Sequence, residues 1–483
     1  MALVRWVCMS DMHFGAENSL LSHVPEGSID VDPQHPSAVL VALVDCLRTL
    51  CAVEAGEGRP TLVLNGDILE MALARDEVAA MAFDRFVDLA FGSGAPIFDD
   101  TVVYVPGNHD HHLWETARER QYAAYVAAVP TGQPLGPPWH ATRLFESDDL
   151  AWPEAELLTA LVRRRAGLDL RVKIAYPNLG VRSEGTGRTV LFHHGHFVEP
   201  LYRLMSSLKD IVFPRQPTGL EIWDWEADNF AWIDFLWSTL GRSGEVGRDM
   251  GLVYDMLQSD EALAILADDV GTASTRTLPA TVRPETAALV RVVLRVVATH
   301  VARHERADPT QLLGPSATAG LRDYVTGPLL RQLEREHPGA AEGPVSFVFG
   351  HTHKPYESVE HLPGLTQSVQ VFNSGGWVVD TERTASLQGA SVVVVDDDCR
   401  VASVRLYNQA DDPSGYRVRL APPAAGPTDA LHDGLARVID PGAPPWSGFS
   451  EAVARAVAQR RAILPDIIER GVELTRPVEA VHR

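Results

Sequence analysis

Lysine is nearly absent from this chain of 483 residues: Lys173, Lys209 and Lys354 are the only three among 42 basic residues. The formal net charge is −22, so the chain lacks the overall positive charge with which proteins attract nucleic acid or anionic membranes. Long apolar runs are missing too, and no stretch approaches the roughly 20 apolar residues of a transmembrane helix. These absences argue against a membrane span and against a long polyanion as partner.

Cysteine is also scarce. The four residues Cys8, Cys46, Cys51 and Cys399 form no CxxC pair, which argues against a disulfide framework and against a thiolate metal site. The N-terminal MALVRWVCMSD passes directly into a strand-like run and has none of the regions of a secretory signal. We therefore expect a cytoplasmic protein.

What the chain does contain is a series of short apolar runs that end in turn-forming or polar residues. Their content of β-branched and aromatic residues predicts buried strands at 3–11, 61–67, 101–110, 189–196, 345–353, 369–377, 391–398 and 401–408. Helical patterns separate the early runs, at 37–53, 77–91 and 115–129. This alternation predicts an α/β core with at least partly parallel strands.

The pattern also predicts how the chain is divided. Residues 1–196 and 341–410 carry the strands and form the two parts of the core, whereas 197–340 is helix-like throughout and is interpreted as a helical insert. The remainder, 411–483, begins with a linker rich in Pro, Ala and Gly and ends in an amphipathic helix at about 449–471.

The strand ends carry side chains that bind metals. They are Asp11 and His13 in SDMHFG, Asp67 in NGD, Asn108, His109 and Asp110 in GNHD, His194 in HHGH, and His351 and His353 in GHTH. The ends of parallel strands meet at one edge of a sheet, and side chains two residues apart on a strand point the same way. This mixed oxygen and nitrogen set suits Mn²⁺, Fe or Zn²⁺, and its size suits two ions about 3.5–4 Å apart.

The order of these motifs, DxH, GD, GNHD, HG and GHxH, resembles the calcineurin-like metallophosphoesterase superfamily over about 1–200 and 341–410. The resemblance implies a layered β-sandwich flanked by helices, with 197–340 as an inserted helical cap subdomain. It implies that one ion is held by Asp11, His13 and His353, the other by Asn108, His194 and His351, with Asp67 bridging. It further implies that His109 faces the phosphate as general acid or transition-state donor, and that Asp110 orients His109.

The resemblance implies a phosphoesterase that uses two divalent ions, Mn²⁺ being favoured over Fe or Zn²⁺, for in-line attack by a metal-bridging hydroxide. Within this superfamily, we expect a small nucleotide-like or other small phosphodiester as substrate, because the acidic composition disfavours long polyanions. Three alternatives stay open. The first is a UDP-diacylglucosamine hydrolase, whose family has a comparable insert but GNRD in place of GNHD. The second is a repair exonuclease, whose family shares SDxHxG and GNHD but needs a basic groove, and none is evident in this sequence. The third is a non-catalytic metal-binding scaffold, which would not need His109.

Further residues give weaker signals. His196, Arg203 and Asn373 are candidate substrate contacts. The simpler interpretations are a packed or solvated histidine for His196, a solvated surface charge for Arg203, and a residue that supports the loop for Asn373. His111 and His112 are expected to open the next helix. The Trp-rich stretch WDWEADNFAWIDFLWSTL (223–240) forms an apolar stripe, and we expect it to pack on the core or on a second copy of the chain rather than to cover a lipid or a base.

Overall fold

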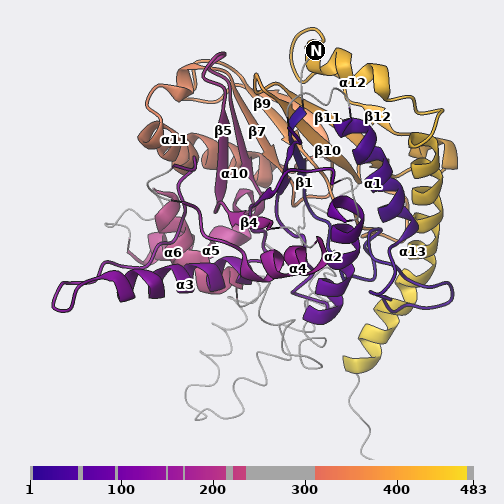
Figure 1. Cartoon of the computed structure of the whole chain (residues 1–483), viewed down its shortest axis with the longest axis horizontal. Helices are drawn as coiled ribbons and strands as arrows, with labels where there is room; N and C mark the ends of the chain where they lie inside the picture. Colours follow the sequence, from indigo (N-terminus) through magenta and orange to yellow (C-terminus); the bar gives the residue numbers. More distant parts are fainter. Residues whose placement is uncertain are drawn as a thin grey trace, which may run out of the picture.

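Two β-sheets lie face to face between two layers of helices (Figure 1). The computed structural model describes residues 4–52, 58–92, 96–147, 151–166, 169–213, 221–234 and 310–475. The first sheet has the strand order β12-β11-β10-β1-β2-β3-β4 and the second the order β5-β6-β7-β9-β8. The predicted α/β class is confirmed.

The first sheet combines a parallel half with an antiparallel half. Its strands are β1 (Val4–Met9), β2 (Thr61–Leu64), β3 (Thr101–Tyr104), β4 (Arg171–Ile174), β10 (Gly389–Asp396), β11 (Val401–Asn408) and β12 (Arg419–Leu420). Strands β1 to β4 pair in parallel, and β10 pairs with β1 in the antiparallel sense. Every residue of β10 is buried, because this Val-rich strand is covered on both faces.

The second sheet is parallel at its centre and antiparallel at both edges. Its strands are β5 (Asn178–Arg182), β6 (Thr189–His193), β7 (Val345–Phe349), β8 (Tyr356–Glu360) and β9 (Val369–Asn373). Strands β6, β7 and β9 run in parallel, so their carboxyl ends share one edge. Apolar side chains from both sheets, among them Val63, Val103, Phe192 and Phe372, form the layer between them.

Helices cover the outer face of each sheet. In one core cluster, α1 (Ala38–Cys51), α2 (Asp76–Phe91), α3 (His112–Ala128), α4 (Glu156–Ala166), α12 (Ala430–Val438) and α13 (Trp446–Thr475) pack against the first sheet. A second cluster joins α6 (Ile222–Ile233), α10 (Pro315–Tyr324) and α11 (Leu330–Glu336) to the second sheet. Figure 1 shows α1 and α13 on one side of the molecule and α10 and α11 on the other. The three helices predicted from the early periodicity correspond to α1, α2 and α3.

The described parts of the segment 197–340 contain helices and no strand. They include the short helical turns η1 (His196–Val198) and η2 (Pro200–Arg203), followed by α5 (Leu204–Val212), α6, α10 and α11. Residues 235–309 of the predicted insert, which include the last part of the Trp-rich stretch (235–240), lie outside the described residues. In the described half of that stretch, Trp225 and Ile233 are buried in the core, as expected.

The predicted C-terminal helix is confirmed as α13, which continues through Pro465. It belongs to the main core, since Trp446, Phe449 and Val453 are buried in the same cluster as the first sheet. Among the described residues, no helix combines the length and the apolar character that crossing a membrane requires.

Candidate metal centre

The side chains predicted as metal ligands follow five strands and meet at one place. Asp11 and His13 follow β1, Asp67 follows β2, Asn108 follows β3, His194 follows β6, and His351 and His353 follow β7. Each of these side chains is no more than 3% exposed. The two sheets thus contribute ligands from facing edges, and the structure brings together all seven predicted residues.

The loops that carry these ligands have an unusual backbone. Of the six described non-glycine residues with positive φ, five are predicted ligands: Asp11, His13, Asp67, His351 and His353. Such conformations cost of order 1–3 kcal/mol each and gather at functional sites. We expected strand alternation to direct the side chains of Asp11 and His13 to the same side, and this expectation was wrong. Strand β1 ends at Met9, and left-handed backbone conformations orient both side chains.

Three glycines allow the close approach of these loops. A Cβ atom added to Gly66, Gly107 or Gly350 would lie less than 3.0 Å from a side chain of His194, Asp67 or Asp11, respectively. The motifs therefore contain glycine beside the ligand because the ligand side chains occupy the space of a Cβ.

The distances between ligand atoms match those around a metal ion. Two ligands of a tetrahedral ion, each at about 2.0–2.15 Å, lie roughly 3.2–3.5 Å apart. His353 Nε2 lies 3.4 Å from Asp11 Oδ1, and His194 Nε2 lies 3.3 Å from Asp67 Oδ2 and 3.1 Å from Asn108 Oδ1. His13 Nε2 is 3.7 Å from Asp67 Oδ2. These buried His and Asp groups could hold a metal ion.

Two ring nitrogens that face each other are a further indication of a metal site. His351 Nδ1 lies 3.3 Å from His194 Nε2, while His194 Nδ1 lies 3.0 Å from the carbonyl oxygen of Asn65. The Asn65 carbonyl accepts the Nδ1 proton, so neutral His194 turns a lone pair toward His351. A cation between the two rings would satisfy both nitrogens.

Each ligand histidine has an acceptor behind it. The outward nitrogen faces Glu70 Oε2 at 2.8 Å for His13, Asp380 Oδ2 at 2.6 Å for His353, Glu199 Oε1 at 3.4 Å for His351, and the Asn65 carbonyl for His194. Acceptors at this position set the tautomer and direct the other nitrogen to a metal. The donor set and its surroundings therefore fit a metal centre.

His109 lies beside this cluster and is oriented by Glu70. Its ring is 4.8 Å from that of His13, and its Nδ1 lies 2.8 Å from Glu70 Oε1. Glu70 thus accepts from both imidazoles, and it also accepts the backbone amides of Ala72 and Leu73. Glu70 was not predicted from the sequence, although its position three residues after Asp67 was a usable signal.

The expected role of Asp110 needs correction. Its oxygens accept backbone amides, at 2.8 Å from Gly107 and 2.7 Å from Ile68, and it forms no described contact with the His109 ring. Asp110 therefore ties the loop after β3 to the loop after β2. It shapes the site through the backbone, whereas Glu70 orients the imidazole.

The electrostatics favour charged carboxylates. Burial alone would raise the pKa of Glu70, but the charge and hydrogen bonds of His109 and His13 hold that pKa well below its usual range. The pKa of Asp67 is likewise held low, against burial, by His194 and His109. Burial opposes protonation of His194, yet the Asp67 carboxylate outweighs it and raises the pKa of His194 to about 9. The cluster is thus a strong attractor of positive charge.

The three candidate substrate contacts have different surroundings. His196 is fully buried, with its ring 5.7 Å from that of His194, so it adjoins the cluster. Arg203 lies over the ring of Trp225, 5.2 Å from its centroid. Asn373 donates to Gly350 and Thr352 and accepts from Gly375, so its amide is used to hold the GHTH loop. The simpler interpretation of Asn373 as a loop support is the correct one.

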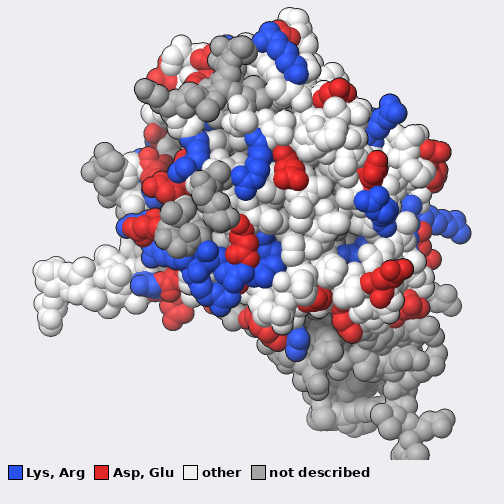
Figure 2. All heavy atoms as spheres, turned by 45° about the vertical axis from the view of Figure 1, so that its right-hand side comes forward, with Lys and Arg blue, Asp and Glu red and all other residues white. Residues whose placement is uncertain are grey.

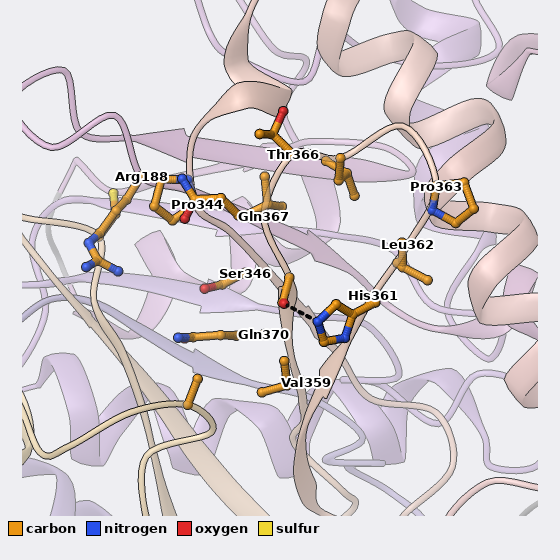
Figure 3. A pocket seen from close by; sticks show the side chains of 15 residues that line it. Arg188, Pro344, Ser346, Val359, His361, Leu362, Pro363, Thr366, Gln367 and Gln370 are labelled. Carbon is orange, nitrogen blue, oxygen red and sulfur yellow. Dashed lines mark hydrogen bonds between the residues drawn. The ribbon is translucent and has the colours of Figure 1, made fainter.

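A cavity of about 780 Å³ lies at the opposite end of the second sheet (Figure 3). Its lining includes Pro344, which precedes β7, Gln370 near the start of β9, and the side chains of Arg188 and His361. The ligand loops follow the other ends of these strands, and no ligand of the cluster lines this cavity. It is a feature distinct from the metal centre.

Comparison of the chain with protein-family models gives no match, and comparison with curated proteins also gives none.

Proposed function

We propose that this protein is a two-metal phosphoesterase of the calcineurin-like type, and that its substrate is a small phosphodiester. The observation that carries the proposal is the convergence of five strand ends into one buried cluster with metal-like spacing, beside a histidine backed by a carboxylate. Asp11, His13 and His353 would hold one ion, and Asn108, His194 and His351 the other. Asp67 lies between these two groups and would bridge them.

Bound cations would supply positive charge that neutralises a phosphoryl oxygen and activates water. The protein's own task is to orient the ester and to protonate the leaving oxygen. His109 suits that task, since Glu70 accepts its Nδ1 proton and thereby orients the ring beside the candidate metal ligands. The Glu70 carboxylate also stabilises the protonated imidazole that must donate.

Surface charge supports a small substrate over a long polyanion. On the face drawn in Figure 2, several basic side chains gather at the lower left of the view, and acidic side chains border them. The consecutive arginines at the end of α4 are paired with carboxylates. Arg163, Arg164 and Arg165 form ion pairs with Asp169, Asp84 and Asp88, respectively. Paired arginines are poorly suited to bind a nucleic-acid backbone.

The test is hydrolysis of p-nitrophenyl phosphate and bis-p-nitrophenyl phosphate by metal-stripped protein, with Mn²⁺, Zn²⁺, Mg²⁺ or Fe²⁺ added back. We expect metal-dependent turnover, greater on the diester, that falls by about 10²–10⁴ in His109→Ala, the range of a general acid. His361→Ala, at the distant cavity, is the matched control and should retain full activity. Absence of turnover with every metal and both esters would count against the phosphoesterase.

A further inference from the structure

The second sheet carries polar side chains at both ends of its parallel strands. The candidate metal ligands follow the carboxyl ends, whereas the cavity of about 780 Å³ lies at the amino ends. Three neighbouring strands each contribute one polar residue to its lining. Arg188 directly precedes β6, Ser346 is the second residue of β7, and Gln370 is the second residue of β9. The volume lies within the roughly 300–1,000 Å³ of small-molecule sites.

The cavity lies at the edge of the layer between the two sheets. Ser346 and Gln370 are partners in the register of β7 and β9, so they lie next to each other. Two residues further along these strands, Val348 and Phe372 belong to the apolar layer between the sheets. Side chains two residues apart on a strand share a face, so the layer ends in two polar groups. From the first sheet, Cys399 in the turn between β10 and β11 also lines the cavity.

These two polar groups have no partner within the described part of the chain. Ser346 is only 8% exposed, and its hydroxyl makes no hydrogen bond to a described residue. The same holds for the half-buried side-chain amide of Gln370. By contrast, His361 on the cavity wall lies 3.0 Å from the Ser368 hydroxyl (Figure 3). A buried hydroxyl without a partner has lost its hydrogen bonds to water, and a ligand in the cavity would restore them.

Arg188 adds a positive charge that no described carboxylate balances. The chain has 64 acidic residues against 42 basic ones, and arginines close in sequence or on the adjoining turn are paired. Arg182 lies 3.8 Å from Glu184. Arg400 lies 3.0 Å from Asp396. The guanidinium of Arg188 forms no ion pair or hydrogen bond with a described residue, and no Asp or Glu is among the described residues that line the cavity. An unpaired guanidinium favours an anion, and its planar group of donors matches a carboxylate or a phosphate.

The rest of the lining is apolar on one side. Figure 3 shows the polar ends of the three strand residues on one side of the view, and Leu362 and Pro363 on the other. We propose that this cavity binds a small organic anion, whose carboxylate or phosphate group is held by Arg188, Ser346 and Gln370. The apolar part of the ligand lies against Leu362 and Pro363. This site is separate from the metal centre and takes no part in the proposed hydrolysis.

The test is isothermal titration calorimetry of full-length, metal-loaded protein with phenylacetate and with phenylphosphonate. These two anions join a carboxylate or a phosphate-like group to a phenyl ring, and benzyl alcohol is the uncharged control ligand. We expect at least one anion to bind at this site, and the one that binds more tightly identifies the head group. Arg188→Ala should weaken this binding about 10–100-fold, which is the effect of losing hydrogen bonds to a charged group. Gln370→Leu should weaken it as well. Arg417→Ala, which is exposed and lies outside the cavity, is the matched control and should bind as wild type does.

A metal-centre variant distinguishes the two sites. The binding that depends on Arg188 should persist in Asp67→Ala, since the metal centre lies at the other end of the sheet, and circular dichroism establishes that each variant is folded. Binding that is lost in Asp67→Ala but unchanged in Arg188→Ala would place the anion on the metal centre and overturn the proposal. So would the absence of binding of both anions to wild type, or equally tight binding of benzyl alcohol. None of these results bears on the phosphoesterase, which is tested by its own assay.

Discussion

Replacing Glu70 by glutamine removes one charge from a side chain that serves two histidines at once. Glu70 Oε2 accepts from His13 and Oε1 from His109, each at 2.8 Å. Oε1 also accepts the amides of Ala72 and Leu73. A glutamine amide has one oxygen and one NH₂ group, so it cannot accept on both sides.

The local donors decide how the glutamine is oriented. Three N–H groups, from Ala72, Leu73 and His109, point at the Oε1 position, so the amide oxygen must lie there. The NH₂ group then faces His13 Nδ1, which has to become an acceptor. Its proton moves to Nε2, the nitrogen directed at the cluster, and His13 can no longer ligate in that tautomer.

Two effects of predictable size follow from this exchange. Loss of a carboxylate behind a ligand histidine lowers metal affinity by about 10–100-fold. Hydrogen bonds to charged groups contribute about 1.5–3 kcal/mol and neutral ones about 0.5–1.5 kcal/mol, so protonated His109 loses about 1–1.5 kcal/mol. At saturating metal we therefore expect kcat to fall about tenfold, since about 1.4 kcal/mol is one decade.

The assay is a metal titration of stripped protein, followed by diester hydrolysis at saturating metal. Glu77→Gln, on the exposed side of α2, is the matched control and should change neither quantity. If Glu70→Gln bound metal and hydrolysed the diester like wild type, then Glu70 would neither set the His13 tautomer nor support His109.

Three other predictions concern the centre and the core. Asp67→Ala should lose metal as well as turnover, whereas His109→Ala should lose turnover and keep its metal. Metal analysis of both variants therefore distinguishes a metal ligand from a general acid. Metal retained in Asp67→Ala would exclude the bridging role of Asp67. Gly350→Ala should lower the free energy of unfolding and the metal affinity, since the added Cβ would lie less than 3.0 Å from the Asp11 carboxylate. Gly434→Ala is its control: the added Cβ has no neighbouring atom within 4 Å and the residue lies in a helix. In urea unfolding this variant should be neutral or stabilised by up to about 1 kcal/mol. Arg460→Ala should destabilise by about 2–4 kcal/mol, because this buried guanidinium donates to two carbonyls of the loop after β1; unchanged urea unfolding would contradict it.

The α/β class and the positions of the candidate metal ligands could be predicted from the sequence alone. Both are local signals: β-branched runs indicate buried strands, and the polar residues Asp11, Asn108 and His351, which follow such runs, indicate where a polar edge of the sheet lies. Parallel pairing then brings such ends together without further information. Strands β4, β5, β8 and β12 were not predicted. They are short, they lie at sheet edges, and their sequences lack the continuous apolar runs of the central strands.

The acceptors behind the candidate ligand histidines could not be predicted and became evident only in the folded chain. Asp380 and Glu199 meet His353 and His351 through loops far apart in sequence, so no spacing announces them. Glu70 orients imidazoles and Asp110 connects two loops, and these roles likewise depend on which donors each carboxylate contacts in the folded chain. The positions of the candidate ligands follow from strand ends, which are local features of the sequence. Their orientation depends on packing between loops, and this packing exists only after the two sheets have come together.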